Sequence, residues 1–324
     1  MPSSPPRGFP PVSSRAARGI CFFCVQVFMF LATSISAQTP PKRPRITGID
    51  HVRLYVTDID KSRDFYSKLF GVRLKGGMCF DNSNRCFTVG WRYDQTIELE
   101  QAPAIETRNL LAEVAFTTDD IEQMHSYLAA QGVTVGKISK DAYLKHAYDA
   151  HFEVRDPEGS PISFIQRFAI PIDDPGPGDP WYVKIIHAGF VVRDRPAEDH
   201  FYKDILGFRP YWRGGMKDDK DDWVAMQVPD GTDWVEYMLN VSPTADKKEL
   251  GVMNHIAFGI PDITAAEQQL LKNGWKPGEK PQMGRDGKWQ LNLYDPDDTR
   301  VELMEFTPTQ KPCCSEYTGP HPKP

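Results

Sequence analysis

The hydrophobic and polar positions follow one order four times along the chain. A strand with alternating apolar residues comes first, and an amphipathic helix that begins after Asp and ends at Gly follows it. Two or three further strands, separated by polar turns, complete each unit. Since one helix for three or four strands cannot cover both faces of a sheet, we expect the uncovered face to curl around a cavity shared with a sister unit.

The four units form a duplicated pair. Aligning His51 with His187, and Glu113 with His255, superimposes the opening strands and the helices that follow them. The predicted domains are residues 47–168 and 184–307, joined by a Pro/Gly/Asp-rich linker, residues 169–183, that cannot continue a helix or strand.

Residues 308–324 form a Pro-rich tail with two adjacent cysteines. We expect this tail to be disordered. The alternative is a metal role for Cys313 and Cys314 together with His321.

The strands carry His, Glu or Ser at fixed places. The opening strands contain His51, Glu113, His187 and His255, and the later strands contain Glu98, Ser163, Glu236 and Glu302. Only the second half has a complete set, namely His187, Glu236, His255 and Glu302. Strand parity places these four side chains on concave faces, and it places Ile186, Ala188 and Phe190 on the face covered by the helix. Two imidazoles and two carboxylates suit an open site for Fe2+, Ni2+, Co2+, Mn2+ or Zn2+.

The first half has a poorer set of ligands, because Glu113 stands where the second half has His and Ser163 stands where it has Glu. Arg53 shares the parity of His51. We therefore expect a buried ion-pair cluster of Arg53 with Glu98 or Glu113, and no metal in this half.

Further polar residues share the parity of the second-half ligands. They are Gln290, Asn292, Tyr294 and Arg300. They could orient a polar substrate, or they could form a hydrated rim.

The N-terminus reads as a signal peptide, residues 1–37. Arg15 and Arg18 precede an apolar run that ends in small residues. Removal of residues 1–37 removes three Arg and no acidic residue, so the formal net charge changes from −6 to −9. This negative charge argues against nucleic acid and anionic membranes as partners. We expect a secreted or periplasmic protein that is not inserted in the membrane after cleavage, with an uncleaved anchor as the alternative.

Cys79 and Cys86 stand opposite each other across a short predicted hairpin. They either form a disulfide or remain free thiols, and the sequence favours neither outcome.

Residues 47–307 resemble the vicinal oxygen chelate superfamily, which includes glyoxalase I, extradiol dioxygenases and the bleomycin resistance proteins. The resemblance rests on His in the first strand, on Phe201-Tyr202 in the helix, and on Asp295-Pro296 before Glu302 in the last strand. It implies an α+β fold of four βαβββ modules paired into two open barrels. It also implies one divalent metal ion that holds two adjacent oxygens of a small-molecule substrate, in a monomer or homodimer.

Within that superfamily, the four second-half residues match the metal ligands of bacterial-type glyoxalase I, and Asn240 matches a glutathione-contacting Asn. The match implies lyase or isomerase chemistry, with Glu236 or Glu302 as the proton-transfer base. Val191 stands where that enzyme has Arg. The alternative is a ring-cleavage dioxygenase that uses His187, His255 and Glu302, although Asn292 stands at its Tyr position. A protein that binds a small molecule without turnover is a further alternative.

Overall fold

The computed structural model describes residues 41–70, 73–74, 86–89, 95–103, 109–144, 147–167 and 184–323. The expected signal peptide (residues 1–37), the linker (residues 169–183) and Cys79 lie outside these ranges, so what we expect of them stays a prediction. In the described ranges, no helix is both long and apolar enough to cross a membrane.

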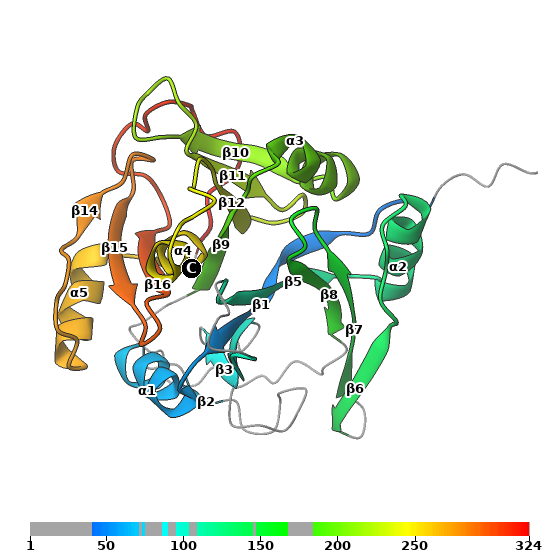
Figure 1. Ribbon diagram of the computed structural model, residues 1–324, viewed down its shortest axis with the longest axis horizontal. Coiled ribbons are helices and arrows are strands. Elements are labelled where there is room, and N and C mark those ends of the chain that lie inside the picture. Colours follow the sequence, from blue (N-terminus) through cyan, green and yellow to red (C-terminus); the bar gives the residue numbers. More distant parts are fainter. Residues whose placement is uncertain are drawn as a thin grey trace, which may run out of the picture. The chain divides into compact units, whose positions relative to one another are not determined.

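The first half contains two modules in one eight-stranded sheet (Figure 1). The first module is β1 (Ile46–Val56), α1 (Ile59–Phe70), β2 (Arg73–Leu74), β3 (Cys86–Val89) and β4 (Gln95–Gln101). The second is β5 (Leu111–Thr118), α2 (Ile121–Ala130), β6 (Ser139–Leu144), β7 (Ala147–Arg155) and β8 (Pro161–Arg167). The strand order is β2-β3-β4-β1-β5-β8-β7-β6.

The second half repeats this plan with one added helix, α4 (Lys247–Met253). Its first module is β9 (Lys184–Val191), α3 (Arg195–Glu198), the π-helix η1 (Asp199–Ile205), β10 (Arg209–Gly214), β11 (Trp223–Gln227) and β12 (Trp234–Met238). Its second is β13 (His255–Ile260), α5 (Ile263–Lys272), β14 (Gln282–Met283), β15 (Trp289–Tyr294) and β16 (Arg300–Glu305). The strand order, β10-β11-β12-β9-β13-β16-β15-β14, matches that of the first half. The predicted fold class, α+β with four βαβββ modules in two curled sheets, is confirmed.

Helix α5 begins and ends where the sequence predicts. The Asp262 side chain accepts a hydrogen bond from the Ala265 N–H at 2.7 Å, which satisfies a donor that the first turn of α5 leaves unpaired. After α5, Gly274 has a φ of 91°, a left-handed conformation that glycine adopts without steric cost. One expected helix differs, because α3 continues as a π-helix in which Leu206 N–H bonds to Phe201 O at 3.0 Å.

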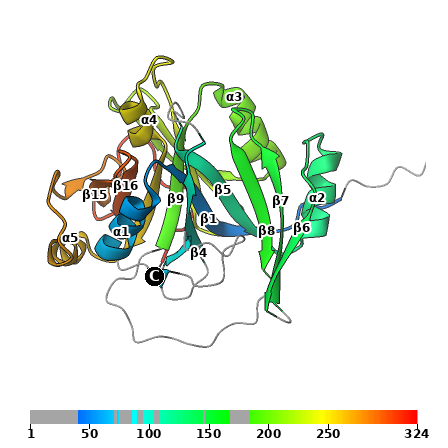
Figure 2. The same cartoon turned by 60° about the horizontal axis from the view of Figure 1, so that its bottom comes forward.

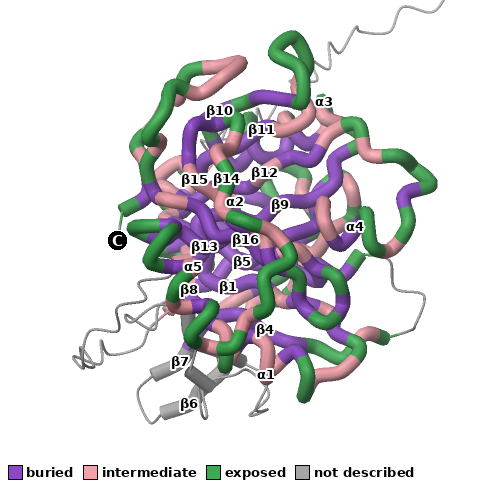
Figure 3. The backbone as a smooth tube through the Cα atoms, turned by 90° about the vertical axis from the view of Figure 1, so that its left-hand side faces the viewer, coloured by how far each residue is buried: buried purple, intermediate pink, exposed green. Residues whose placement is uncertain are grey.

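One hydrophobic core joins the two halves. Phe70 of α1 packs on Phe258 of β13 with ring centroids 5.3 Å apart. The Asn273 amide, just after α5, donates to Leu69 O at 2.8 Å. Helix α1 of the first half therefore lies beside α5 and β16 of the second half (Figures 1 and 2). Buried residues are concentrated in the central strands of both sheets (Figure 3).

The prediction that Ile186 lies on the helix-covered face is wrong, whereas Ala188 and Phe190 lie in the main core as expected. The pairing of β9 with β13 shifts between Ala257 and Phe258, so that Ile185 pairs with Phe258. Ile185 thus takes the core position, and Ile186 packs in a second apolar cluster with Ala257, Met304 and Phe306. A β-bulge reverses the alternation of every residue beyond it, and neighbouring apolar residues such as Ile185 and Ile186 do not reveal where it falls.

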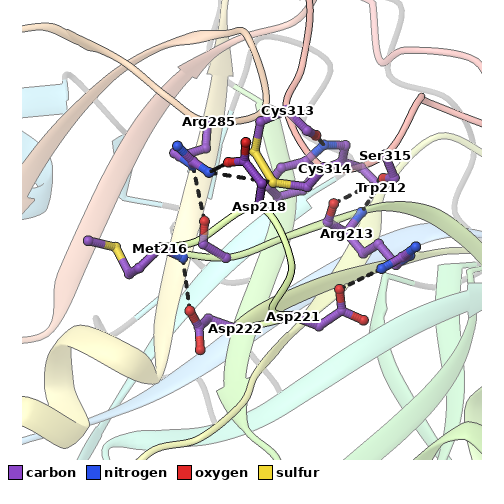
Figure 4. The surroundings of a disulfide bond; sticks show 11 residues. Trp212, Arg213, Met216, Asp218, Asp221, Asp222, Arg285, Cys313, Cys314 and Ser315 are labelled. Atoms are coloured by element: carbon purple, nitrogen blue, oxygen red, sulfur yellow. Dashed lines mark hydrogen bonds and ion pairs between the residues drawn. A yellow bond between two sulfur atoms is a disulfide. The ribbon is translucent and has the colours of Figure 1, made fainter.

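The expectation of a disordered tail is also wrong. Cys313 N–H donates to Arg285 O at 2.8 Å, and Thr318 N–H donates to Tyr211 O at 3.0 Å. The tail therefore uses backbone groups that the two ends of the sheet leave unpaired. Cys313 and Cys314 form a disulfide (Figure 4). Since only thiolates bind metals well, this bond removes the alternative metal role of the two cysteines in this structure.

Candidate metal centre

The four predicted ligands of the second half meet at one point. The Nε2 atoms of His187 and His255 lie 3.1 Å apart. Glu236 Oε2 lies 3.9 and 3.5 Å from these two nitrogens, and Glu302 Oε2 lies 3.5 and 3.6 Å from them. Donor atoms that share one ion at about 2.0–2.2 Å stand roughly 3–4 Å apart, so these side chains fit a divalent metal. The donor atoms of His187, Glu236 and His255 all lie within 4.8 Å of one another.

The sheet register brings these ligands together. Gly189 of β9 pairs with Glu236 of β12 on one side and with His255 of β13 on the other. Ala257 likewise pairs with His187 and with Glu302 of β16. A Cβ added at Gly189 would lie 2.0 Å from His255 Cε1, so only glycine leaves room for that imidazole.

Neighbouring groups orient both imidazoles. His255 Nδ1 lies 3.0 Å from Met253 O, and because a carbonyl only accepts, Nδ1 carries the proton and Nε2 presents its lone pair to the site. The His187 ring is stacked on the Trp234 indole with centroids 4.7 Å apart. Both imidazoles are fully buried.

Burial controls the charge of the cluster. It lowers the pKa of His187, and it lowers the pKa of His255 well below the usual value, so both imidazoles are neutral, as metal binding requires. Burial, assisted by the charge of Glu302, raises the pKa of Glu236 to about 8. The pKa of Glu302 is lowered instead. Burial alone would raise it, but the hydrogen bond with His187 and the charge of Arg300 outweigh burial. The two carboxylates thus differ in protonation before any ion is bound.

A pocket of about 380 Å³ opens beside these ligands. Of the residues expected to contact a substrate, Gln290, Asn292 and Arg300 line it together with Glu236 and Glu302. Gln290 Nε2 donates to Asp286 Oδ1 at 3.2 Å, and Asn292 Nδ2 donates to Glu279 Oε2 at 3.1 Å. Both amides are therefore held by carboxylates in the pocket wall or beside it.

Arg300 approaches the ligands directly. Its Nη2 donates to His255 Nε2 at 2.8 Å. The guanidinium thus uses the same lone pair that a metal ion would take.

The structure places Asn240 and Tyr294 elsewhere. Strand β12 ends at Met238, so Asn240, which the resemblance suggested, lies beyond the strand that carries Glu236. Its φ is 60°, and its amide donates to Asp221 O and to Asp222 Oδ1, both at 2.9 Å. Tyr294 is 36% exposed, and its hydroxyl donates to Glu279 Oε1 at 2.7 Å. Neither residue lines the pocket in the described part of the chain.

Lys288 and Tyr317 are among the residues near the pocket that were not identified from the sequence. Lys288 is fully buried, with Nζ 4.8 Å from the Trp234 ring centroid. It shares the parity of Gln290 and Asn292, so alternation could have found it. Tyr317 lines the pocket from the tail, and no local pattern signals its position.

The first half contains the expected ion-pair cluster. Arg53 Nη1 lies 2.6 Å from Glu113 Oε2, and Arg53 Nη2 lies 3.1 Å from Glu98 Oε2. The Ser163 hydroxyl donates to Glu113 as well. The predicted pairing of Arg53 is confirmed, with both carboxylates engaged. The expectation that no metal binds here stays a prediction.

The chain belongs to the Glyoxalase/Bleomycin resistance protein/Dioxygenase superfamily, whose model matches residues 48–164 and 184–303. This confirms the resemblance seen in the sequence. The chain is 24% identical over 297 residues to lactoylglutathione lyase of Schizosaccharomyces pombe, a match that covers 79% of this chain and 96% of that protein.

Solved structures share the fold. Homoprotocatechuate 2,3-dioxygenase of Brevibacterium fuscum, in complex with 3,4-dihydroxyphenylacetate, superimposes with a TM-score of 0.59 at 20% identity over 87% of this chain and 85% of that chain. The Arthrobacter globiformis enzyme superimposes with a TM-score of 0.58 at 18% identity over 82% of each chain.

Proposed function

We propose that this chain is a metal-dependent enzyme with glyoxalase-like lyase or isomerase activity on a small substrate that carries two adjacent oxygens. The observation that carries the proposal is the convergence of two neutral imidazoles and two carboxylates at the base of a pocket. The likeness to a lactoylglutathione lyase along most of both chains supports the reaction class.

His187, Glu236, His255 and Glu302 would hold the ion. A bound divalent ion supplies Lewis-acid polarisation of a substrate carbonyl, which makes a neighbouring C–H acidic. Glu236 or Glu302 would serve as the proton-transfer base, because both carboxylates line the pocket. Arg300 and Asn292 would orient the oxygens of the substrate from the pocket wall.

An extradiol-type ring-cleavage reaction is the second candidate. His187, His255 and Glu302 form a two-histidine, one-carboxylate set, and the named structural relatives are dioxygenases of this fold. Oxygen consumption with a catechol, measured on iron-loaded protein, would favour this candidate over the first.

The metal content of the purified protein tests both candidates. We expect one divalent ion per chain, lost in His187→Ala and in His255→Ala. His51→Ala, at the corresponding place in the first half, is the matched control and should keep the ion. Circular dichroism of each variant separates a lost ligand from a lost fold. Wild-type protein that does not bind any divalent ion would favour a binding protein that acts without turnover.

We also propose that the protein is exported and stays free of the membrane after cleavage near residue 37. The basic and apolar pattern of the N-terminus supports this, and so does the Cys313–Cys314 disulfide, which is typical of oxidising compartments. Mass spectrometry of the N-terminus of protein recovered outside the cytoplasm tests the proposal. An intact Met1 in that fraction would contradict it.

A further inference from the structure

The C-terminal strap, which we define as residues 309–321, connects the two ends of the second-half sheet. On one side Thr309 N–H donates to Gly287 O at 2.9 Å, beside β14 and β15. On the other side Ser315 Oγ accepts from Arg213 N–H at 2.9 Å and donates to Arg213 O at 3.0 Å, in β10. Since β10 and β14 are the first and last strands of the sheet order, the strap links the two edges that the open barrel leaves apart.

The strap also supplies a wall of the pocket. Tyr317 lines the pocket, and its hydroxyl donates to Asp286 O at 2.9 Å and to Asp286 Oδ2 at 3.1 Å, which fixes the ring. The Tyr317 and Tyr211 ring centroids lie 4.8 Å apart, and those of Tyr211 and Trp234 lie 5.2 Å apart. Because Trp234 is stacked on His187, a continuous row of rings runs from the strap to a metal ligand.

A buried cation holds this row together. Lys288 Nζ lies 4.8 Å from the Trp234 centroid, 5.5 Å from that of Tyr317 and 5.6 Å from that of Tyr211. Nζ has no hydrogen-bond partner among the described residues, and it lies over the faces of these three rings, with the charges of Asp286, Glu302 and Glu236 also acting on it. The strap ring therefore has a fixed position relative to the metal centre.

Apolar side chains line the part of the pocket that adjoins this row, among polar ones such as Gln282, Arg285 and Asp286. The apolar ones include Trp212, Met216, Trp223, Met283 and Met304. Aromatic and thioether side chains pack well against planar rings, while the charged groups Glu236, Glu302 and Arg300 lie at the metal end.

We propose that the strap is part of the substrate-binding site and that Tyr317 is a specificity-determining residue, selecting substrates whose two chelating oxygens are attached to a planar apolar group. This inference rests on the proposed function, because it assumes that the second-half site binds metal and chelating oxygens. The strap contributes Tyr317 to the pocket lining, and the ring row offers the apolar group a surface to stack on.

Two hydroxamic acids test the proposal, because both present the same pair of adjacent oxygens to a metal. The full-length protein is loaded with Co2+, and the dissociation constants of acetohydroxamic and benzohydroxamic acid are measured from the visible absorption of the ion. In the wild type we expect benzohydroxamic acid to bind roughly tenfold more tightly than acetohydroxamic acid. Ring stacking contributes on the order of 1.4 kcal/mol, which corresponds to a tenfold change in the dissociation constant. Tyr317→Ala should remove this preference and leave acetohydroxamic acid unaffected.

Control variants make the test specific. Glu316→Ala changes the exposed neighbour of Tyr317 in the strap and should keep the wild-type preference. Tyr317→Phe keeps the ring and should also keep most of the preference. If Tyr317→Ala fails to fold or to load Co2+, Tyr317→Leu retains an apolar side chain at the strap and should lower the preference.

The outcomes separate the two proposals. Failure of both hydroxamic acids to bind the Co2+-loaded wild type would overturn the proposed function itself. Binding of both acids, with the same ratio of affinities in the wild type and in the Tyr317→Ala or Tyr317→Leu variant, would overturn only the role of Tyr317.

Discussion

The Nε2 atoms of His187 and His255 lie 3.1 Å apart although 68 residues separate them in the chain. The two histidines stand on adjacent antiparallel strands, β9 and β13. His187 pairs with Ala257 and His255 pairs with Gly189, so the two histidines are two residues out of direct register. Their closeness therefore depends on the backbone at Gly189, over which the His255 ring lies.

Gly189→Ala should weaken metal binding by about tenfold or more, because the added Cβ would meet His255 Cε1 at 2.0 Å and would displace the imidazole. Titration of the metal-free protein with Co2+ measures the effect. Gly278→Ala is the matched control, since its Cβ would meet no atom within 4 Å, and its affinity should equal that of the wild type. An unchanged Co2+ affinity in Gly189→Ala would show that His255 is not a ligand.

Glu198→Gln should remove part of the pH dependence of stability. Glu198 is fully buried, and burial together with the charge of Asp156 raises its pKa to about 8 from a usual value of 4.5. Between these values the folded state binds a proton that the unfolded state has lost, so this residue makes the free energy of unfolding fall as the pH rises from about 4.5 to about 8.

Thermal midpoints measured from pH 5 to pH 9 test this prediction. The wild type should lose stability toward pH 9, and Glu198→Gln should lose less. Glu122→Gln, an exposed residue of α2, should follow the wild type. Parallel curves for the wild type and Glu198→Gln would mean that Glu198 does not titrate in this range.

Arg53→Met should destabilise the protein, because Glu98 and Glu113 would lose the guanidinium that pairs with both. Removing one partner of a buried ion pair costs about 3–5 kcal/mol, and the 29% exposure of the Arg53 side chain reduces our expectation to roughly 2–3 kcal/mol. Urea denaturation measures the change. Arg63→Met breaks only pairs with the exposed Asp60 and Asp64, and should cost roughly 0–1 kcal/mol.

Reduction of the Cys313–Cys314 disulfide should loosen the strap. A dithiol reductant supplies two electrons and two protons, which converts the disulfide to two thiols while the reductant becomes a disulfide. Trp212 Nε1 donates to Cys313 O at 3.2 Å, and Arg285 Nη2 lies 3.7 Å from Cys314 Sγ, so the pair lies between the two sheet edges that the strap joins (Figure 4).

We expect reduction to lower the thermal midpoint by about 2–4 °C if the loosening costs on the order of 1 kcal/mol. It should also speed proteolysis within residues 309–321. The double variant Cys313→Ser/Cys314→Ser should not respond to the reductant in either assay. A response of equal size in that variant would assign the effect to other cysteines.

The alternation along each strand was sufficient to predict which residues meet at the candidate metal site. His187, Glu236, His255 and Glu302 share one parity on repeated strands, and each side chain lies on the face that this parity predicts. The Asp that begins α5 and the Gly that follows it were predictable for a different reason, because helix ends depend on neighbouring residues alone. The pairing of Arg53 with Glu98 and Glu113 also followed from parity.

Other features were decided only by the tertiary structure. A bulge exchanged the faces of Ile185 and Ile186, and the end of β12 left Asn240 outside the pocket. The strap had no periodicity to predict its order, because its hydrogen-bond partners are the unpaired edges of a sheet that exists only after folding. Local alternation determines the face on which a side chain lies, whereas the curl of the sheet and the contacts between distant segments determine the distances at which side chains meet.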